Sequence, residues 1–309
     1  MTASASATAL PPGLVAPAAG RSRRRPALRQ AFLLGGVLLL VAIAWEALKW
    51  LAGDPWRIAL GAFTYTHRPP FTLRIASDIS LPHLWTIVGT LFEPVPAGPP
   101  LWIFLTSAAL YTLRTAFVGF AAGALLGLGL GIVFVHSRFL ERALVPWVVG
   151  SQTVPIIAIA PIVVVALGAN WVSVAVVATY LTFFPVAIAA IRGLRAYDQR
   201  AGELMRSYAA STPQVLWKLR LPASVPYLFS ALRVAAAASV VGTIIGELPS
   251  GIPEGLGRAV LNFTQYYVTS PERLWATVVA CAMTGLVFVG LIRVAEAFLT
   301  RGRHRPAAF

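Results

Sequence analysis

Lysine and cysteine are nearly absent from this chain of 309 residues. Its two lysines, Lys49 and Lys218, do not form the GxxxxGK[ST] loop that cradles nucleotide phosphates, so the chain does not hold ATP through that motif. Its one cysteine, Cys281, lies in an apolar run and supports neither a disulfide nor a thiolate metal site. A His-Glu-x-x-His helix and a nucleophile elbow are also missing from the sequence. We therefore expect no bound cofactor, no metal and no catalytic residues.

Charged residues are scarce as well, and those present are mostly basic. They make up 12% of the chain, about half the fraction usual in soluble domains, whereas 58% of the residues are hydrophobic. Lysine and arginine number 25 against 11 acidic residues, a net charge of +14. The basic residues bracket apolar runs, which favours contact with lipid headgroups over nucleic-acid binding.

Six apolar runs have about the 20 residues that a helix needs to cross a bilayer. They cover residues 31–51, 107–135, 145–167, 171–191, 226–245 and 274–299. The first run is longer than the apolar core of a cleavable signal, so we expect it to be retained as a span. The sequence therefore predicts an all-α integral membrane protein with six transmembrane helices.

The expected divisions of the chain follow from these runs. They are a disordered basic tail (1–30), a first transmembrane helix (31–52), an outer loop with interfacial helices (53–106), a core (107–299) with a polar loop at 192–225, and a second basic tail (300–309). In the outer part, Glu46 and Lys49 are expected to pair with each other, and His67 and His83 to lie on the surface.

The arginines predict the orientation of the spans. The proposed outer segments hold five arginines, Arg57, Arg68, Arg74, Arg258 and Arg273, whereas most of the others fall in the two tails, in the turn at 136–142 and in the loop at 192–225. Because cytoplasmic segments carry the excess of basic residues, we expect both termini and this polar loop to lie in the cytoplasm. The charges are read as lying at the ends of the spans.

Glycine recurs every fourth residue in the second run, at Gly119, Gly123, Gly127 and Gly131. Such a face lets a neighbouring helix approach closely. Packing inside the bundle is the favoured interpretation, and contact with a second copy of the chain is the alternative. A nucleotide-binding role is not supported, because no strand precedes these glycines.

Polar residues and prolines interrupt the third run. Pro155 and Pro161 free backbone carbonyls that must face protein or water, and the polar residues are Ser151, Gln152 and Thr153. We nominate these five residues as candidates for lining a pathway, with simple hydrogen bonding between helices as the alternative. Pro185 is expected to kink the fourth span. Glu247, at the end of the fifth run, is a further pathway candidate, and the favoured alternative for it is an ion pair with Arg258 or Arg273.

The polar loop carries the segment ELMRSYAASTPQVLWKLRLP, residues 203–222. The residues at 198–210 favour a first short helix. Ser211 and Gln214 have the spacing of a capping box, which predicts a second helix beginning at Thr212. Pro222 disfavours helical geometry in Leu221, so the second helix is expected to stop there.

This order of residues resembles the EAA loop of binding-protein-dependent ABC importer permeases. By position, Glu203 looks like the acid of the motif, Leu204 and Met205 take the place of its two alanines, and Leu221 and Pro222 close it. Ala209 stands where the family has glycine, which predicts that the first helix continues through this position. The resemblance implies that the loop transmits ATPase movement to the membrane helices, through Glu203, Leu204, Met205, Arg206, Ser207, Tyr208, Ala209, Ala210, Ser211, Leu221 and Pro222.

The runs LRTAFVGFAAGALLGLGLGI and VPIIAIAPIVVVALG are similar to those of the nitrate, sulfonate and taurine class of these permeases. The resemblance spans residues 107–299. It implies a bacterial inner-membrane protein that works as a permease dimer, with two cytoplasmic ABC ATPase subunits that hold ATP and Mg and with a periplasmic or lipid-anchored solute-binding protein. The substrates of the class include nitrate, sulfonates, taurine, thiamine precursors and riboflavin. The alternative is a secondary carrier or channel with a cytoplasmic regulatory loop.

Overall fold

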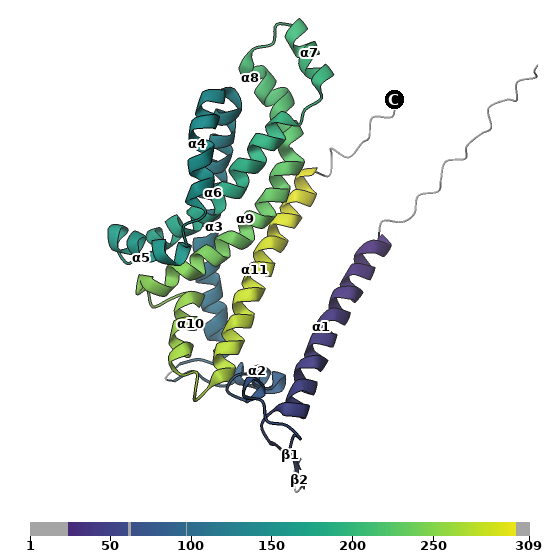
Figure 1. The fold of residues 1–309 in the computed structure, drawn as a ribbon, viewed down its shortest axis with the longest axis vertical. Coiled ribbons are helices and arrows are strands. Elements are labelled where there is room, and N and C mark those ends of the chain that lie inside the picture. The colour runs from purple at the N-terminus through teal and green to yellow at the C-terminus, as the bar shows by residue number, and fades with distance from the viewer. Residues whose placement is uncertain (1–23, 61–62, 97, 301–309) are drawn as a thin grey trace, which may run out of the picture.

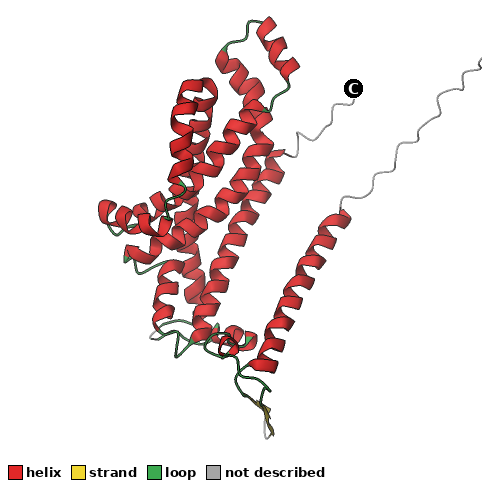
Figure 2. Cartoon of the chain, in the orientation of Figure 1, coloured by secondary structure: helices red, strands yellow, loops and turns green. Residues whose placement is uncertain are grey.

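The computed structural model describes residues 24–60, 63–96 and 98–300, and most of them are helical. Figures 1 and 2 show long helices running side by side, with a small hairpin at one end. Five helices are long and apolar enough to cross a membrane, and a bent helix pair makes a sixth candidate if it is counted as one span. The predictions of an all-α membrane fold and of its long helices are confirmed; the third predicted span, at 145–167, departs from the expected form.

The elements in chain order are the following: α1 Arg24–Ala52, β1 Trp56–Leu60, β2 Phe63–His67, η1 Arg74–Ala76, α2 Leu84–Thr90, α3 Leu101–His136, α4 Arg138–Ser151, α5 Ile156–Leu167, α6 Trp171–Arg195, α7 Gln199–Ser207, α8 Thr212–Val215, η2 Leu216–Arg220, α9 Leu221–Ser250, α10 Leu256–Gln265 and α11 Pro271–Thr300. Helix α1 begins before residue 31, so the expected disordered tail is wrong for residues 24–30; residues 1–23 and 301–309 lie outside the described residues.

Helices α3, α6 and α9 form the centre of the bundle, and the glycine face of α3 packs on α6. A Cβ atom on Gly119 would lie 2.4 Å from the Cβ of Ala178, and one on Gly131 would lie 2.4 Å from the Cβ of Ala190. Gly123 and Gly127 meet α6 equally closely. The glycines therefore allow close packing within the chain. Because α6 covers this face, the alternative of a contact between two copies through it is wrong.

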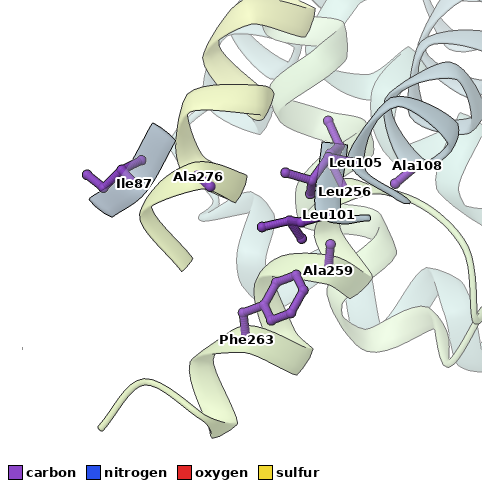
Figure 3. Packing of buried hydrophobic residues seen from close by; sticks show 8 residues of the cluster. All are labelled: Ile87, Leu101, Leu105, Ala108, Leu256, Ala259, Phe263 and Ala276. Carbon is purple, nitrogen blue, oxygen red and sulfur yellow. The ribbon is translucent and has the colours of Figure 1, made fainter. Parts of the chain in front are cut away.

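Two apolar clusters fill the bundle. One joins α3, α10, α11 and α2 (Figure 3), and consists of Ile87, Leu101, Leu105, Ala108, Leu256, Ala259, Phe263 and Ala276. The other joins α3, α6, α9 and α11, and consists of Ala116, Phe120, Val186, Ala235, Ala236, Val240 and Phe288. Small residues predominate among the buried residues of α9, so this helix approaches its neighbours closely.

Helix α1 lies apart from the bundle along most of its length in Figure 1 and is tied at its carboxyl end to the segment between α1 and α3. Lys49 binds Asp78 and the carbonyl of Leu81, whereas Glu46 accepts hydrogen bonds from the ring of His83 and from the amide of Leu84, both at 2.8 Å. The expected Glu46–Lys49 pair is therefore wrong, and His83 is buried, not at the surface. These partners lie 29 to 38 residues away in the sequence, so local spacing could not predict them.

The segment between α1 and α3 contains an antiparallel hairpin as well as a short helix. Strands β1 and β2 pair with Trp56 opposite His67 and Leu60 opposite Phe63. The expectation of helices alone in this loop was incomplete, since α2 is its one α-helix in the described residues and α3 begins at Leu101. An isolated antiparallel β-bridge between Pro94 and Pro100 closes the last turn before α3.

The third predicted span is broken. Helices α4 and α5 meet at an angle of 98° across residues 152–155. Pro155 lies in an extended conformation (φ −60°, ψ 119°) at the start of α5, whereas Pro161 lies inside that helix. The expectation of one interrupted span is therefore corrected to two helices, because the missing amide of Pro155 coincides with a complete change of direction. The expected basic turn at 136–142 reduces to Ser137, which caps α4 by accepting from the amide of Leu140.

Candidate functional site

The polar loop forms the end of the molecule opposite the hairpin (Figure 1). Asp198 caps α7 by accepting a hydrogen bond from the amide of Arg200 at 2.9 Å. At the next helix the amide of Ser211 donates to Oε1 of Gln214 at 2.9 Å, and α8 begins at Thr212. The predicted first short helix and the predicted start of the second helix at Thr212 are confirmed.

Helix α7 nevertheless ends at Ser207, earlier than expected. Ala209 has a φ of +49°, the one positive φ at a non-glycine residue among those described. The amide of Ala210 donates to the carbonyl of Met205, and that of Ala209 to the carbonyl of Arg206, both at 2.9 Å. This is the Schellman pattern, which needs a left-handed residue directly after the helix cap. The prediction of a helix continuing through Ala209 was wrong, because the hydrogen bonds of the cap outweigh the strain at alanine.

We expect Ala209→Gly to relieve this strain and to raise stability by up to about 1 kcal/mol, since an L side chain costs about that much in the left-handed region. Ala209→Val should lower the thermal midpoint and weaken any activity that depends on the loop, because a β-branched residue adopts positive φ poorly. Thermal unfolding of the purified variants measures both effects. A valine variant as stable as the glycine variant would show that the loop does not depend on this turn.

The second short helix does not stop at Leu221. Leu221 is itself helical (φ −62°, ψ −46°), and its amide donates to the carbonyl of Leu216, five residues back. Residues Leu216–Arg220 thus form a π-helical turn, whose wider ring gives Pro222 room to follow without a clash. The expected stop was wrong, and one helical segment runs from Thr212 to Ser250.

The exposed surface of the polar loop carries apolar as well as charged side chains. The exposed fractions of Leu204, Tyr208 and Trp217 are 58%, 79% and 70%. Glu203, Arg206 and Ser207 are exposed beside them. Gly202 is buried instead, where a Cβ atom would lie 2.8 Å from the ring of Tyr197. The loop therefore presents Glu203, Leu204, Arg206 and Tyr208 outward, whereas Met205 is half-buried.

Glu247 is fully buried among hydrogen-bond donors. The hydroxyl of Thr112 on α3 donates to both of its carboxylate oxygens, at 2.8 and 3.0 Å, and the amide of Gly257 donates at 2.7 Å. The amide of Leu256 in turn donates to the Thr112 hydroxyl at 2.8 Å. The expected ion pair with Arg258 or Arg273 is wrong: the structure records neither, and Arg273 lies 3.7 Å from Glu93.

The turn that carries these donors is built closely around the carboxylate. Gly255 has a φ of +99°, and a Cβ atom there would lie 2.5 Å from Oε1 of Glu247. A Cβ atom on Gly257 would lie 2.4 Å from the carbonyl of Ile244. Glycine at both positions lets the first turn of α10 and the residue before it lie directly against α9. The carboxylate therefore joins α3, α9 and α10 at one point.

The residues nominated in the third span lie at the bend between α4 and α5. Tyr180 of α6 donates a hydrogen bond to the carbonyl of Ser151, and Thr153 donates to the carbonyl of Gly150. Nε2 of Gln152 is buried and has no hydrogen-bond partner in the part of the chain that is described. Pro155 and Pro161 are exposed. No recorded hydrogen bond joins this bend to Glu247 in the described residues, so the structure does not unite the pathway candidates into one cluster.

Arg114 was missed by the sequence analysis. It is the fourteenth residue of the 36-residue helix α3, so the interpretation that charges lie at span ends was wrong. With Tyr111 and Ser107 it lines a cleft of about 450 Å³, closed on the other side by residues 253–255, including Glu254. An ionisable residue inside a span is a signal in itself. The arginine within LRTAFVG was therefore visible, although read only as part of a similar run.

Long apolar helices, an exposed loop between two of them and a broken span define a polytopic helical membrane protein. Residues 119–303 match the family described as the inner membrane component of binding-protein-dependent transport systems, and the chain belongs to this family.

The relatives support this assignment. The formylaminopyrimidine transport permease protein ThiX of Halalkalibacterium halodurans is 35% identical over 47% of this chain and 58% of its own length. The riboflavin transport system permease protein RibX of Chloroflexus aurantiacus is 28% identical over 69% of this chain and 77% of its own. The putative aliphatic sulfonates transport permease protein SsuC of Bacillus subtilis is 28% identical over 75% and 81%. The chain thus spans little more than half of the first relative.

The fold is similar to that of a solved transporter. A chain from the structure of the MetNI methionine ABC transporter in inward-facing conformations aligns over 67% of this chain and 99% of its own, with a TM-score of 0.55 and 20% identity. The likeness supports the predicted permease fold over two thirds of this chain, whereas the other third has no counterpart in that alignment.

Proposed function

We propose that this chain is the translocating subunit of an ATP-driven importer of the bacterial inner membrane, with both termini in the cytoplasm. Two copies pair, two ABC ATPase subunits hold ATP and Mg, and a periplasmic or lipid-anchored protein delivers a small solute. The observation that carries this proposal is the exposed surface of α7 and its C-cap, where Glu203, Leu204 and Tyr208 lie at the end of the molecule. Exposed apolar side chains rimmed by charge indicate a protein contact.

The substrate is proposed as a class only. Relatives named for a formylaminopyrimidine, for riboflavin and for sulfonates suggest a small sulfonate, nitrate, taurine or a heteroaromatic compound for this chain. The pathway is proposed to run past the buried carboxylate of Glu247 and past the bend between α4 and α5, at Ser151, Gln152, Thr153, Pro155 and Pro161. Arg114, which lacks a recorded ion pair in the described residues, is proposed to face the same route.

Transport follows as a shift between two states of the bundle. Closure of the ATPase pair on ATP draws the α7 surfaces together, and the long helix that starts at Thr212 carries this displacement toward α10. ATP must then bind the outward-open assembly more tightly than the inward-open one, because a ligand shifts a conformational equilibrium only through differential affinity.

Copurification tests the proposal. The double variant Glu203→Ala/Arg206→Ala should lose the ATPase subunit on gentle purification, and ATP hydrolysis stimulated by the binding protein should fall at least tenfold. The fold should remain, because both side chains are exposed. A matched control removes one acid and one base from the outer segments, Glu272→Ala/Arg68→Ala, and should keep the ATPase.

The alternative, a secondary carrier, makes the opposite prediction. If the chain purified alone and moved solute into vesicles without ATP, the importer assignment would be wrong. Normal transport by the Glu203→Ala/Arg206→Ala variant would reject only the assignment of the coupling surface.

A further inference from the structure

A second cleft, separate from the candidate pathway, lies where the inner ends of α3 and α6 meet the start of α4. Its volume is about 970 Å³, and η2 and the segment leading into α7 complete its wall. Four arginines line it: Arg138, Arg142, Arg195 and Arg220. We name these four residues the arginine cleft.

Glu141 supplies the one carboxylate in the lining of this cleft, and this carboxylate is already paired with Arg195. Glu141 accepts two hydrogen bonds from Arg195, at 2.9 and 2.6 Å, a bidentate pair. Arg138, Arg142 and Arg220 have no recorded salt bridge with any described residue. The cleft therefore carries about three uncompensated positive charges.

Arg220 is held in place by a ring contact, but one of its hydrogen-bond donors has no acceptor among the described residues. Its guanidinium carbon lies 5.4 Å from the centre of the Tyr197 ring, a cation–π arrangement. Its Nε is buried and lacks a hydrogen-bond partner among the described residues. A buried donor without an acceptor costs about 1–3 kcal/mol, so the fold keeps an arginine that an external acceptor would satisfy.

The chemistry of the lining fits a phosphate group. Guanidinium groups match tetrahedral oxyanions with paired N–H donors, and arginine is the preferred residue for phosphate recognition. The same wall contains apolar residues, Val135, Val145 and Pro146. On α4, Phe139 and Trp147 are each 78% exposed, as expected for a helix next to lipid. An anion that joins a phosphate to an apolar body would satisfy both parts of the wall.

We propose that the arginine cleft binds a phosphate-bearing anion on the cytoplasmic side, supplied either by the headgroup of an anionic phospholipid or by a free phosphate compound. Bound there, the anion connects α4 to η2 and so stabilises the start of the long helix next to the coupling loop. The proposal concerns ligand binding by this chain alone and stands apart from the transported substrate.

The first arm of the test uses lipid. Native mass spectrometry of the full chain, purified with phosphatidylcholine containing phosphatidylglycerol, should show phosphatidylglycerol retained by the unaltered chain. Arg138→Gln/Arg142→Gln should retain at least fivefold less. Arg29→Gln/Arg293→Gln removes two exposed arginines outside the cleft and should bind as the unaltered chain does.

The second arm uses inorganic phosphate in detergent, compared with chloride at equal ionic strength. A rise in the thermal midpoint that the Arg138→Gln/Arg142→Gln variant lacks assigns the site to a free phosphate compound; lipid retention without this rise assigns it to a headgroup. Arg138→Lys/Arg142→Lys keeps the charge but not the planar donors, so intermediate binding supports the phosphate geometry even if the glutamine variant is unstable. Equal lipid retention in cleft and control variants, with no phosphate-specific shift, overturns the proposal.

Discussion

Gly127→Ala is expected to destabilise the bundle by about 2–3 kcal/mol, because one methyl group has no room between α3 and α6. Its Cβ atom would lie 2.4 Å from the carbonyl of Phe183 and 2.9 Å from the amide of Ala187. Both are backbone atoms, so no side-chain rotation relieves the clash and the helices must separate. A lower thermal midpoint and a lower yield of monodisperse protein in detergent would measure the effect.

The same helix supplies the control. Gly129 is two residues away, and a Cβ atom there would meet nothing within 4 Å. Gly129→Ala should be neutral or slightly stabilising, since alanine is the better helix former. Equal midpoints for the two variants would contradict the close approach of α3 and α6.

Glu247→Ala is expected to be the most damaging single change outside the glycine face. It strands the amide of Gly257 and the hydroxyl of Thr112 in a buried site, and each unsatisfied donor costs about 1–3 kcal/mol. It also releases α10 from α9, so we expect transport to fall more than tenfold in variants that still fold. Thermal unfolding and uptake into vesicles measure the two consequences separately.

Two further variants test whether this expected loss comes from the hydrogen bonds of Glu247. Glu254→Ala removes an exposed carboxylate from the same turn and should leave stability within about 0.5 kcal/mol of the unaltered chain. Thr112→Val combined with Glu247→Ala should cost less than the two single changes added together, because the residues share hydrogen bonds. Additive losses would mean that the carboxylate and the hydroxyl act independently.

Apolar run length was enough to predict the long helices, and short-range chemistry was enough to predict the start of α8. Ser211 and Gln214 lie three residues apart, so sequence spacing alone indicated their capping box. The glycine spacing of α3 likewise indicated close packing, although only the structure identified α6 as the neighbour.

The rest depended on partners distant in sequence or on competition between local rules. Glu247 is joined to Thr112, 135 residues away, whereas spacing offered only nearby arginines. At Ala209, helix propensity favoured continuation, but the capping hydrogen bonds prevailed. At Leu221, the following proline favoured a stop, but a π-helical turn accommodated it. In each case a local preference of about 1 kcal/mol was smaller than the contacts that opposed it.

The unbroken helical segment from Thr212 to Ser250 has a mechanical consequence. Its 39 residues extend about 58 Å, and the closely packed pair Ala235–Ala236 lies about 35 Å from the first residue and about 18 Å from Glu247. If the segment moves as one rigid body about this pair, with Pro226 and the π-helical turn of its long arm unbent, a sideways displacement at the loop end reaches the carboxylate reversed in direction and about halved in size. Such a lever delivers a smaller displacement with a larger force. A displacement of a few ångströms at the loop would then stretch the hydrogen bonds of Glu247 far enough to break them.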